Sequence, residues 1–145
     1  MALLLYSVRV AAVTGGSMEP SLREGSRIVI DKLTARLFSL NRGDVIVFKN
    51  PRDAGTTEVK RVIGLPGELV LIEGGTISVT PPGGRLVEFP RGTAVGGNGQ
   101  IADFRVQLGP EDYFVLGDNR GMSTDSRVFG AVRPADILGR VIYSF

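Results

Sequence analysis

The sequence of 145 residues contains no histidine, no cysteine and no tryptophan. Without cysteine, the chain has no disulfides, no zinc–thiolate sites and no thiol nucleophile. Without histidine, it lacks the commonest general base and the commonest metal ligand of proteins. We therefore expect neither a metal nor a cofactor, and a hydrolytic enzyme of this composition would use a lysine as its base.

The chain also has almost no excess of one charge sign over the other. The chain has 17 basic and 15 acidic residues, a formal net charge of +2, and its basic residues are 14 Arg and three Lys. The arginines are scattered, whereas a nucleic-acid interface needs basic residues clustered on one face. The ten aromatic residues do not interleave with them as single-strand binding platforms require. We expect no nucleic-acid partner.

No apolar run is long enough to span a bilayer, which takes roughly 20 residues. The best candidate, residues 1–13, is short and is interrupted by Arg9. It does not resemble a secretory signal, because its basic residue follows the apolar residues instead of preceding them. Residues 1–16 are therefore either a short apolar leader, forming a first strand or packing on the core, or a truncated membrane anchor.

Short apolar runs between Gly and Pro residues predict an all-β protein. The expected strands are 27–33, 44–48, 58–63, 69–72, 76–79, 85–89, 101–108, 113–116 and 138–145. The expected short helices are 34–40 and a turn or more that begins at Pro134, and the expected turns are 41–44 and 50–55.

We predict an antiparallel β-sheet or partly open barrel core with a small β lobe inserted into it. A chain of this length can bury a hydrophobic core. The core comprises residues 17–67 and 113–145, and the inserted lobe comprises residues 68–112. Within the lobe, residues 81–100 are rich in Gly and Pro and favour a mobile loop or hairpin extension.

Ser17 follows Gly15 and Gly16 and precedes Pro20, a pattern typical of a tight turn. A serine hydroxyl is a weak nucleophile until a neighbouring base takes its proton. Backbone N–H groups of such a turn can stabilise an oxyanion, each typically contributing about 3 kcal/mol to lowering the barrier. Taken alone, this segment could be any loop.

Lys60 lies within an expected strand, 58–63, where it shares a face with Glu58 and Val62. An isolated lysine on a strand usually faces solvent, but a general base must be neutral, and burial among apolar side chains disfavours the charged form. Lys32 and Lys49 are weaker candidates, since Lys49 leads directly into the expected turn. Lys60 is the lysine placed to be buried.

A dense polar run, residues 117–127, leaves the apolar strand 113–116 directly. Ser123 could hold the lysine amine with its hydroxyl, and Asp125 and Arg127 lie two apart and can form a charge-assisted brace. Asp118 and Asn119 could cap the turn. Alone, the run could be a solvated turn. The supporting positions that we take from it are Asp118, Asn119, Arg120, Asp125, Ser126 and Arg127.

The three segments together resemble the bacterial type I signal peptidases, Ser/Lys endopeptidases that remove signal peptides. Residues 17–22 resemble the nucleophile box, usually Ser-Met-x-Pro-Thr-Leu, with Ser21 in place of Thr. Residues 43–48 resemble the second motif and 60–67 the lysine box. Residues 117–127, with Phe129-Gly130, resemble the last box, with Gly121-Met122 in place of the commoner Asp-Asn.

The resemblance implies roles for individual residues. Ser17 is the nucleophile, and Lys60 is the general base that later protonates the leaving amine. Ser123 orients Lys60. The Ser17 backbone N–H is one oxyanion donor, and Gly15 occupies the position where some members carry a serine that completes the oxyanion hole. Shallow apolar substrate pockets are lined by Val13, Met18, Leu22 and Val59.

The resemblance also implies a substrate and a location. Members cleave after small residues in an Ala-x-Ala-like pattern, so the expected partners are signal peptides of exported preproteins and the membrane surface. The family fold is an antiparallel β structure anchored by one or two amino-terminal helices. Its active site lies on the extracytoplasmic side of the cell membrane.

Two alternatives differ in class. A self-cleaving repressor-type Ser/Lys peptidase shares the dyad and a β core, but it would need a DNA-binding domain or a scissile peptide before Ser17, and it would not explain the 117–127 run. A non-catalytic β-barrel binding module would explain the arginines. Affinity that falls strongly with salt would support that module, and salt-insensitive peptide cleavage would exclude it.

Overall fold

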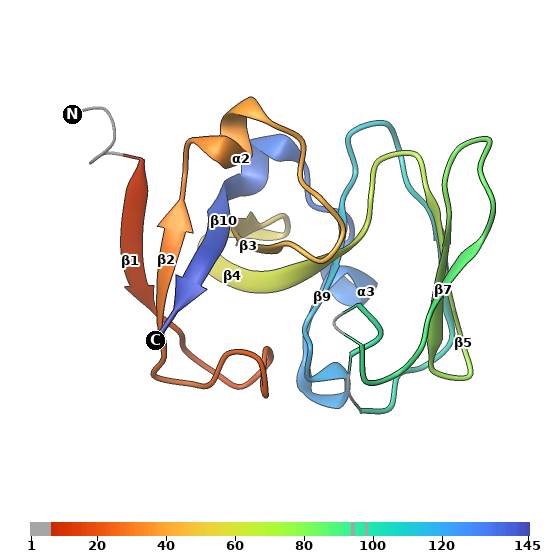
Figure 1. The fold of residues 1–145 in the computed structure, drawn as a ribbon, viewed down its shortest axis with the longest axis horizontal. Helices are drawn as coiled ribbons and strands as arrows, with labels where there is room; N and C mark the ends of the chain where they lie inside the picture. The colour runs from red at the N-terminus through yellow and green to blue at the C-terminus, as the bar shows by residue number, and fades with distance from the viewer. Residues whose placement is uncertain (1–6, 94, 98) are drawn as a thin grey trace.

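The computed structural model describes residues 7–93, 95–97 and 99–145, which form two antiparallel sheets and a few short helices (Figure 1). The six-stranded sheet has the order β1-β2-β10-β3-β4-β9. Its strands are β1 (Val8–Ala12), β2 (Arg27–Asp31), β3 (Val45–Asn50), β4 (Asp53–Gly64), β9 (Phe114–Leu116) and β10 (Ile137–Ser144). The prediction of an all-β fold with antiparallel sheets is confirmed. In this sheet β1 and β9 are the two edge strands.

The four-stranded sheet has the order β7-β6-β5-β8 and is built entirely from residues between β4 and β9 (Figure 1, right). Its strands are β5 (Leu69–Glu73), β6 (Thr76–Thr80), β7 (Val87–Phe89) and β8 (Phe104–Gln107). β7 and β8 are shorter than the expected strands 85–89 and 101–108. The residues 81–100, expected to be a mobile loop or hairpin extension, include β7.

The two sheets share one hydrophobic core. Ile63 of β4 and Phe114 of β9 pack in a single cluster with Ile72 of β5 and Ile77 of β6, all at most 1% exposed. A Cβ at Gly64 would lie 2.6 Å from Val70 Cγ2, so glycine permits this close approach between β4 and β5. The shared core fixes the end of β4 against the second sheet.

The faces of the six-stranded sheet bury two further clusters, which follow the alternation of β3. On one face, Ile46 and Phe48 pack with Phe129 of α3 (Ser126–Phe129), the two rings lying 5.8 Å apart. On the other face, Val47 packs with a cluster that contains Met18 and Leu22, from the segment between β1 and β2. This second cluster anchors the segment that carries Ser17.

β4 is longer than predicted, because the β3–β4 turn is tighter than the expected 50–55. Asn50 of β3 already pairs with Asp53 of β4, and the Asn50 side-chain oxygen accepts a hydrogen bond from the Arg52 N–H at 2.9 Å. The turn prediction 50–55 was wrong in extent, since Ala54 and Gly55 belong to the strand. The resulting twelve-residue strand pairs with β3 up to Arg61 and with β9 from Arg61 onwards.

The helices are short. The expected helix 34–40 is a single turn, α2 (Thr34–Leu37), preceded by Asp31, whose Oδ1 accepts hydrogen bonds from the N–H groups of Leu33 and Thr34. The expected helix start at Pro134 is a 3₁₀ turn, η2 (Pro134–Asp136). A second 3₁₀ turn, η1 (Arg120–Met122), lies in the polar run after β9.

The first described residues form a strand, not a helix. β1 pairs with β2 along its length, which confirms the strand interpretation for Val8–Ala12. Residues 1–6 of the predicted leader or anchor lie outside the described residues. Within the part of the chain that the structure describes, every helix is too short to cross a bilayer.

Candidate active site

Ser17 lies in a turn that is anchored to the hydrophobic core by apolar side chains. Met18 and Leu22 are buried, 1% and 6% exposed, and the turn is closed by backbone hydrogen bonds from Leu22 N–H to Met18 O at 3.0 Å and from Glu19 N–H to Gly16 O at 3.1 Å. Gly15, at φ +78°, makes the left-handed bend that starts the turn. Ser17 is thereby held, half-buried, at the surface of the third core cluster.

Lys60 lies beside Ser17. Its side chain is 3% exposed, and its Nζ is 2.8 Å from Ser17 Oγ, to which it donates a hydrogen bond. The two residues are 43 positions apart in sequence, and the shared contact follows from the place of β4 in the middle of the sheet. The expected burial of this lysine is therefore present, and a neutral amine at this position could accept the serine proton directly.

A second group contacts the amine. Glu58, two residues earlier on β4, accepts a hydrogen bond from Lys60 Nζ at 3.3 Å through Oε2. The other carboxylate oxygen, Oε1, accepts a hydrogen bond from Asn50 Nδ2 at 3.4 Å. Our list of candidate residues omitted Glu58, although the period of a strand places it on the same face as Lys60.

The polar run after β9 holds the serine turn. Asn119 donates two hydrogen bonds to it, from its backbone N–H to Ser17 O at 2.9 Å and from Nδ2 to Gly16 O at 3.1 Å. Figure 1 shows the segment between β1 and β2 extending toward the segment that follows β9. Asn119 makes no side-chain cap on η1, so its expected capping role is replaced by a bridge between two distant segments.

Ser123 lies in the same cluster but does not contact the amine. Its Oγ is buried and has no hydrogen-bond partner among the described residues. A Cβ at Gly117 would collide with Ser123 Oγ and would lie 2.5 Å from the Ser17 carbonyl oxygen. Gly117 thus lies between Ser123 and the serine turn, where a larger residue would not fit. That Ser123 orients Lys60 stays a prediction.

Ion pairs surround the site. Asp118 pairs with Arg61 of β4 at 2.8 Å instead of capping its own turn, and Asp125 pairs with Arg127 at 2.8 Å, as expected for the brace. Asp125 also accepts a hydrogen bond from the Gly117 N–H at 3.2 Å. Two acidic groups next to the site are therefore neutralised by partners.

Arg120 and Ser126 support the run from inside. Ser126 Oγ accepts a hydrogen bond from the Val115 N–H at 2.9 Å. Arg120 is 2% exposed and donates hydrogen bonds to Gly117 O at 2.8 Å, Val95 O at 2.7 Å and Gly96 O at 3.2 Å. Burial lowers the pKa of the Arg120 guanidinium to about 10, so it remains charged at neutral pH.

An open cleft of about 340 Å³ ends at Ser17 and Lys60. Of the predicted pocket residues, Val13, Met18 and Val59 line it, whereas Leu22 packs beneath it in the core. The lining residues that our candidates omitted are Ala11, Ala12, Thr14, Ile28, Ile30, Val47, Thr56, Thr57 and Glu58. Most come from β1, β2 and the β4 extension, whose proximity depends on strand order.

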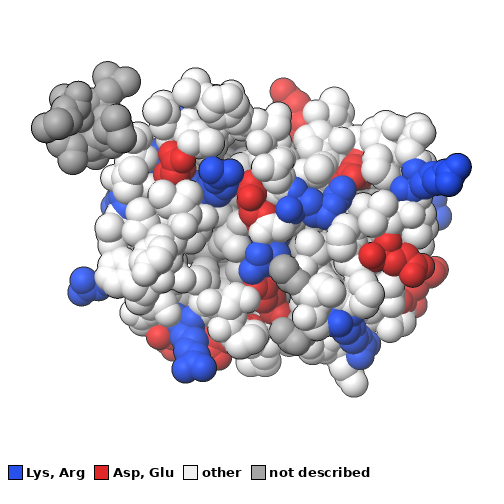
Figure 2. Space-filling model, in the orientation of Figure 1, with Lys and Arg blue, Asp and Glu red and all other residues white. Residues whose placement is uncertain are grey.

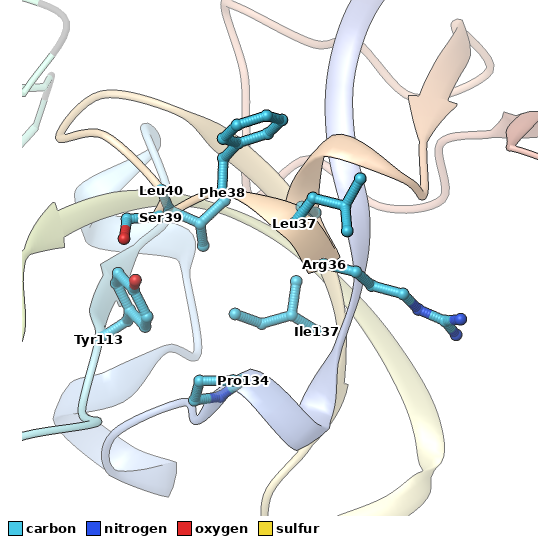
Figure 3. Close-up of a pocket in the computed structure, with 9 residues that line it drawn as sticks. Arg36, Leu37, Phe38, Ser39, Leu40, Tyr113, Pro134 and Ile137 are labelled. Carbon is cyan, nitrogen blue, oxygen red and sulfur yellow. The ribbon is translucent and has the colours of Figure 1, made fainter.

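A second hollow is separate from these residues. It measures about 260 Å³ and lies beside α2, and Figure 3 shows Leu37 and Phe38 on one side of it and Tyr113, Pro134 and Ile137 on the other. None of its lining residues belongs to the serine turn, to β4 or to the polar run after β9. The chemistry that the sequence predicts is therefore confined to the first cleft.

Basic and acidic side chains are interspersed on the face drawn in Figure 2. That face carries no continuous basic surface of the kind that a nucleic-acid interface requires. The distribution gives no support to the binding-module alternative.

Comparison with known proteins identifies the family. Residues 1–145 match the family described as signal peptidase, peptidase S26. The chain belongs to this family. The prediction of a signal peptidase I-like serine endopeptidase, an enzyme that removes signal peptides, is thus confirmed at the level of the family.

Individual relatives agree. The chain is 36% identical over 137 residues to signal peptidase I V of Bacillus subtilis, covering 88% of this chain and 79% of that protein. It is 33% identical over 153 residues to signal peptidase IB of Staphylococcus aureus, covering 97% and 78%. A protein described as probable signal peptidase I-2 of Synechocystis is 34% identical, and the chain spans 61% of its length.

A solved structure is also similar. The crystal structure of a signal peptidase I from Enterococcus faecalis superposes with a TM-score of 0.59 at 32% identity, covering 73% of this chain and 98% of that one. The fold of two antiparallel sheets is therefore the fold of a signal peptidase I. Enzymes of this family are membrane-anchored and act on the extracytoplasmic side.

Proposed function

We propose that this chain hydrolyses the signal peptides of exported preproteins with Ser17 as nucleophile and Lys60 as general base. The observation that carries the proposal is the 2.8 Å contact between a buried lysine amine and a serine hydroxyl at the end of a partly apolar cleft. Nucleophile and base within hydrogen-bond reach are the geometric requirement for such a pair.

The reaction needs only these two side chains for proton transfer. The neutral Lys60 amine takes the Ser17 hydroxyl proton while Ser17 Oγ bonds to the scissile carbonyl carbon. The resulting ammonium gives that proton to the leaving amine nitrogen as the peptide C–N bond breaks, which leaves an ester on Ser17. The amine then takes a proton from water, whose oxygen attacks the ester, and returns the proton to Ser17 Oγ.

The backbone of the serine turn can stabilise the oxyanion. The Ser17 N–H donates to no acceptor among the described residues, so it is available to the developing charge. Gly15 has no side chain to offer, and its Cβ position faces open space with no atom within 4 Å. Ser17 N–H is the one donor that we assign from this geometry.

The cleft favours an extended chain with small side chains near the scissile bond. Val13, Met18 and Val59 line it together with Ser17, and these apolar side chains suit small apolar residues such as alanine. This supports cleavage after an Ala-x-Ala-like sequence. Ser123, Asp125 and Arg127 stay as supporting residues of the proposal, with Asn119 added as the residue that fixes the serine turn.

We also place the catalytic part at the extracytoplasmic membrane surface. Val10 of β1 and Tyr143 of β10 are 54% and 64% exposed, and both are register partners of Val29, so they lie on one face of the sheet. Exposed apolar and aromatic side chains of this kind suit a membrane interface. Sedimentation with liposomes should drop for a Val10→Ser, Tyr143→Ser variant, and unchanged sedimentation would contradict this placement.

The central experiment is cleavage in detergent of a preprotein with an Ala-x-Ala site. The wild type should cut after that sequence, and Ser17→Ala and Lys60→Ala should each lose about 10³-fold or more in kcat. Ser21→Ala, an exposed serine of the same turn, and Lys49→Ala, an exposed lysine of β3, are matched controls that should cut normally. Undiminished cleavage by Lys60→Ala would exclude Lys60 as the base.

A further inference from the structure

The catalytic amine has a carboxylate partner that the serine mechanism does not require. Glu58 Oε2 lies 3.3 Å from Lys60 Nζ, and among the described residues it is the one carboxylate in an ion pair with this lysine. The hydroxyl expected to hold the amine, Ser123 Oγ, is buried without a partner in the same part of the chain. Lys60 is therefore held between Ser17 and Glu58.

Glu58 is itself held in place. Its side chain is 20% exposed, it lines the substrate cleft, and Asn50 at the end of β3 donates a hydrogen bond to its second oxygen. Asn50 is fixed in turn by the two-residue β3–β4 turn, through the Arg52 N–H. The tight β3–β4 turn thus fixes Asn50, and Asn50 orients the Glu58 carboxylate.

The other charged groups on neighbouring elements do not compete for the amine. Arg61 pairs with Asp118, and Arg127 pairs with Asp125, so each pair is neutral. Other charged side chains of the serine segment and of β3, such as Glu19 and Lys49, are exposed and make no ion pair with Lys60 among the described residues. Glu58 is the charged group that acts on Lys60 at short range.

We propose that Glu58 is a positioning residue that holds the Lys60 amine against Ser17. The inference rests on the proposed function. When the Ser17 proton passes to Nζ, an ammonium forms beside the Glu58 carboxylate, which stabilises it.

The test compares pH profiles of kcat and kcat/KM in the detergent assay. Glu58→Gln removes the charge but keeps the shape, so kcat should fall about tenfold with little change in KM, and the pH profile should change, because the amine is no longer held against Ser17. Glu58→Asp keeps the charge with a shorter reach, so it should recover part of the lost kcat. Glu88→Gln, an exposed residue of β7, removes the same charge far from the cleft and should leave the profile unchanged.

A readout without catalysis separates the outcomes. The chain has three lysines, so carbon-13 labelled lysine side chains can be followed individually by NMR and assigned with Lys60→Arg. The Lys60 signal should move between the wild type and Glu58→Gln, because a carboxylate that contacts the amine is removed, and it should not move in Glu88→Gln. An unmoved Lys60 signal together with superimposed pH profiles would overturn this role for Glu58. Failure of the wild type to cleave any preprotein would instead overturn the proposed function, whatever the titration shows.

Discussion

Replacing Gly117 by alanine tests how closely the polar run after β9 and the serine turn must approach. The backbone of Gly117 lies between Ser17 and Ser123, and its N–H is bound to Asp125. A Cβ there would be 2.5 Å from the Ser17 carbonyl oxygen and 2.6 Å from Ser123 Cβ. Neither contact involves the far end of a flexible side chain, so backbone must move.

The size of the effect follows from these distances. To reach ordinary van der Waals separation, the Ser17 backbone must shift by roughly 1 Å. That shift strains the hydrogen bond from the Asn119 N–H to Ser17 O, now 2.9 Å, and moves Ser17 Oγ relative to Lys60 Nζ. A misplacement of about 1 Å at a reacting group costs about 10²-fold in rate. Overpacking should cost about 1–3 kcal/mol of folding free energy.

The assay is steady-state cleavage of an Ala-x-Ala preprotein together with denaturant unfolding. Gly117→Ala should lower kcat more than it raises KM, because most of the cleft lining, including Val59 on β4, lies outside the shifted serine turn. Gly121→Ala is the matched control, since its Cβ would meet only Gln100 O at 3.9 Å. If Gly117→Ala had wild-type kcat and wild-type stability, the close approach would not matter and this account of the site would be wrong.

Two further predictions concern stability and pH. Arg120→Met removes three hydrogen bonds to buried carbonyls and should destabilise the fold by about 3 kcal/mol in denaturant unfolding. Burial lowers the pKa of Arg120 to about 10, so the cost of burying its charge disappears as pH rises through 10, and the loss caused by Arg120→Met should be larger at pH 10.5 than at pH 8. Hydrogen bonds, first from the Thr34 side chain and then from the N–H groups of Thr34 and Leu33, hold the pKa of Asp31 below 3.8. The stabilisation is therefore present above pH 3.8 and is lost as pH falls through the lower folded value, so Asp31→Asn should destabilise at pH 7 and do so progressively less in acid.

The parts of the fold that the sequence predicted are those set by local pattern. Apolar runs bounded by Gly and Pro located strands such as β5 and β6 to within a residue, because alternation and turn chemistry act over a few positions. β4 was predicted too short, since Ala54 and Gly55 have low strand propensity. They lie in a register irregularity between the Asn50–Asp53 and Lys49–Thr57 pairs of β3 and β4, which no local pattern indicates. Strand order, which brings β1 and β4 to the same cleft, has no local signal.

In the candidate site too, residues of a local motif were predicted and contacts between distant segments were not. Residues of a recognisable box, such as Ser17 and Lys60, were identified by type and spacing before their contact was seen. Leu22 lies in the same box, yet it faces the core, because the turn places it beneath Ser17. The bridge from Asn119 to the serine turn joins residues about 100 positions apart, and Glu58 became a partner of Lys60 only through the geometry of the β3–β4 turn.

A lysine base places a demand on its surroundings that a histidine base does not. An amine is mostly protonated at neutral pH, so the site must remove it from water without surrounding it with unpaired anions. Lys60 is almost fully buried, and the acidic groups of the polar run, Asp118 and Asp125, are each paired with an arginine. The arginines therefore do more than brace the loop, because an unpaired carboxylate here would favour the ammonium. Among the described residues, Glu58 is the carboxylate that forms an ion pair with the amine, which is why Glu58→Gln should change the pH profile while Glu88→Gln should not.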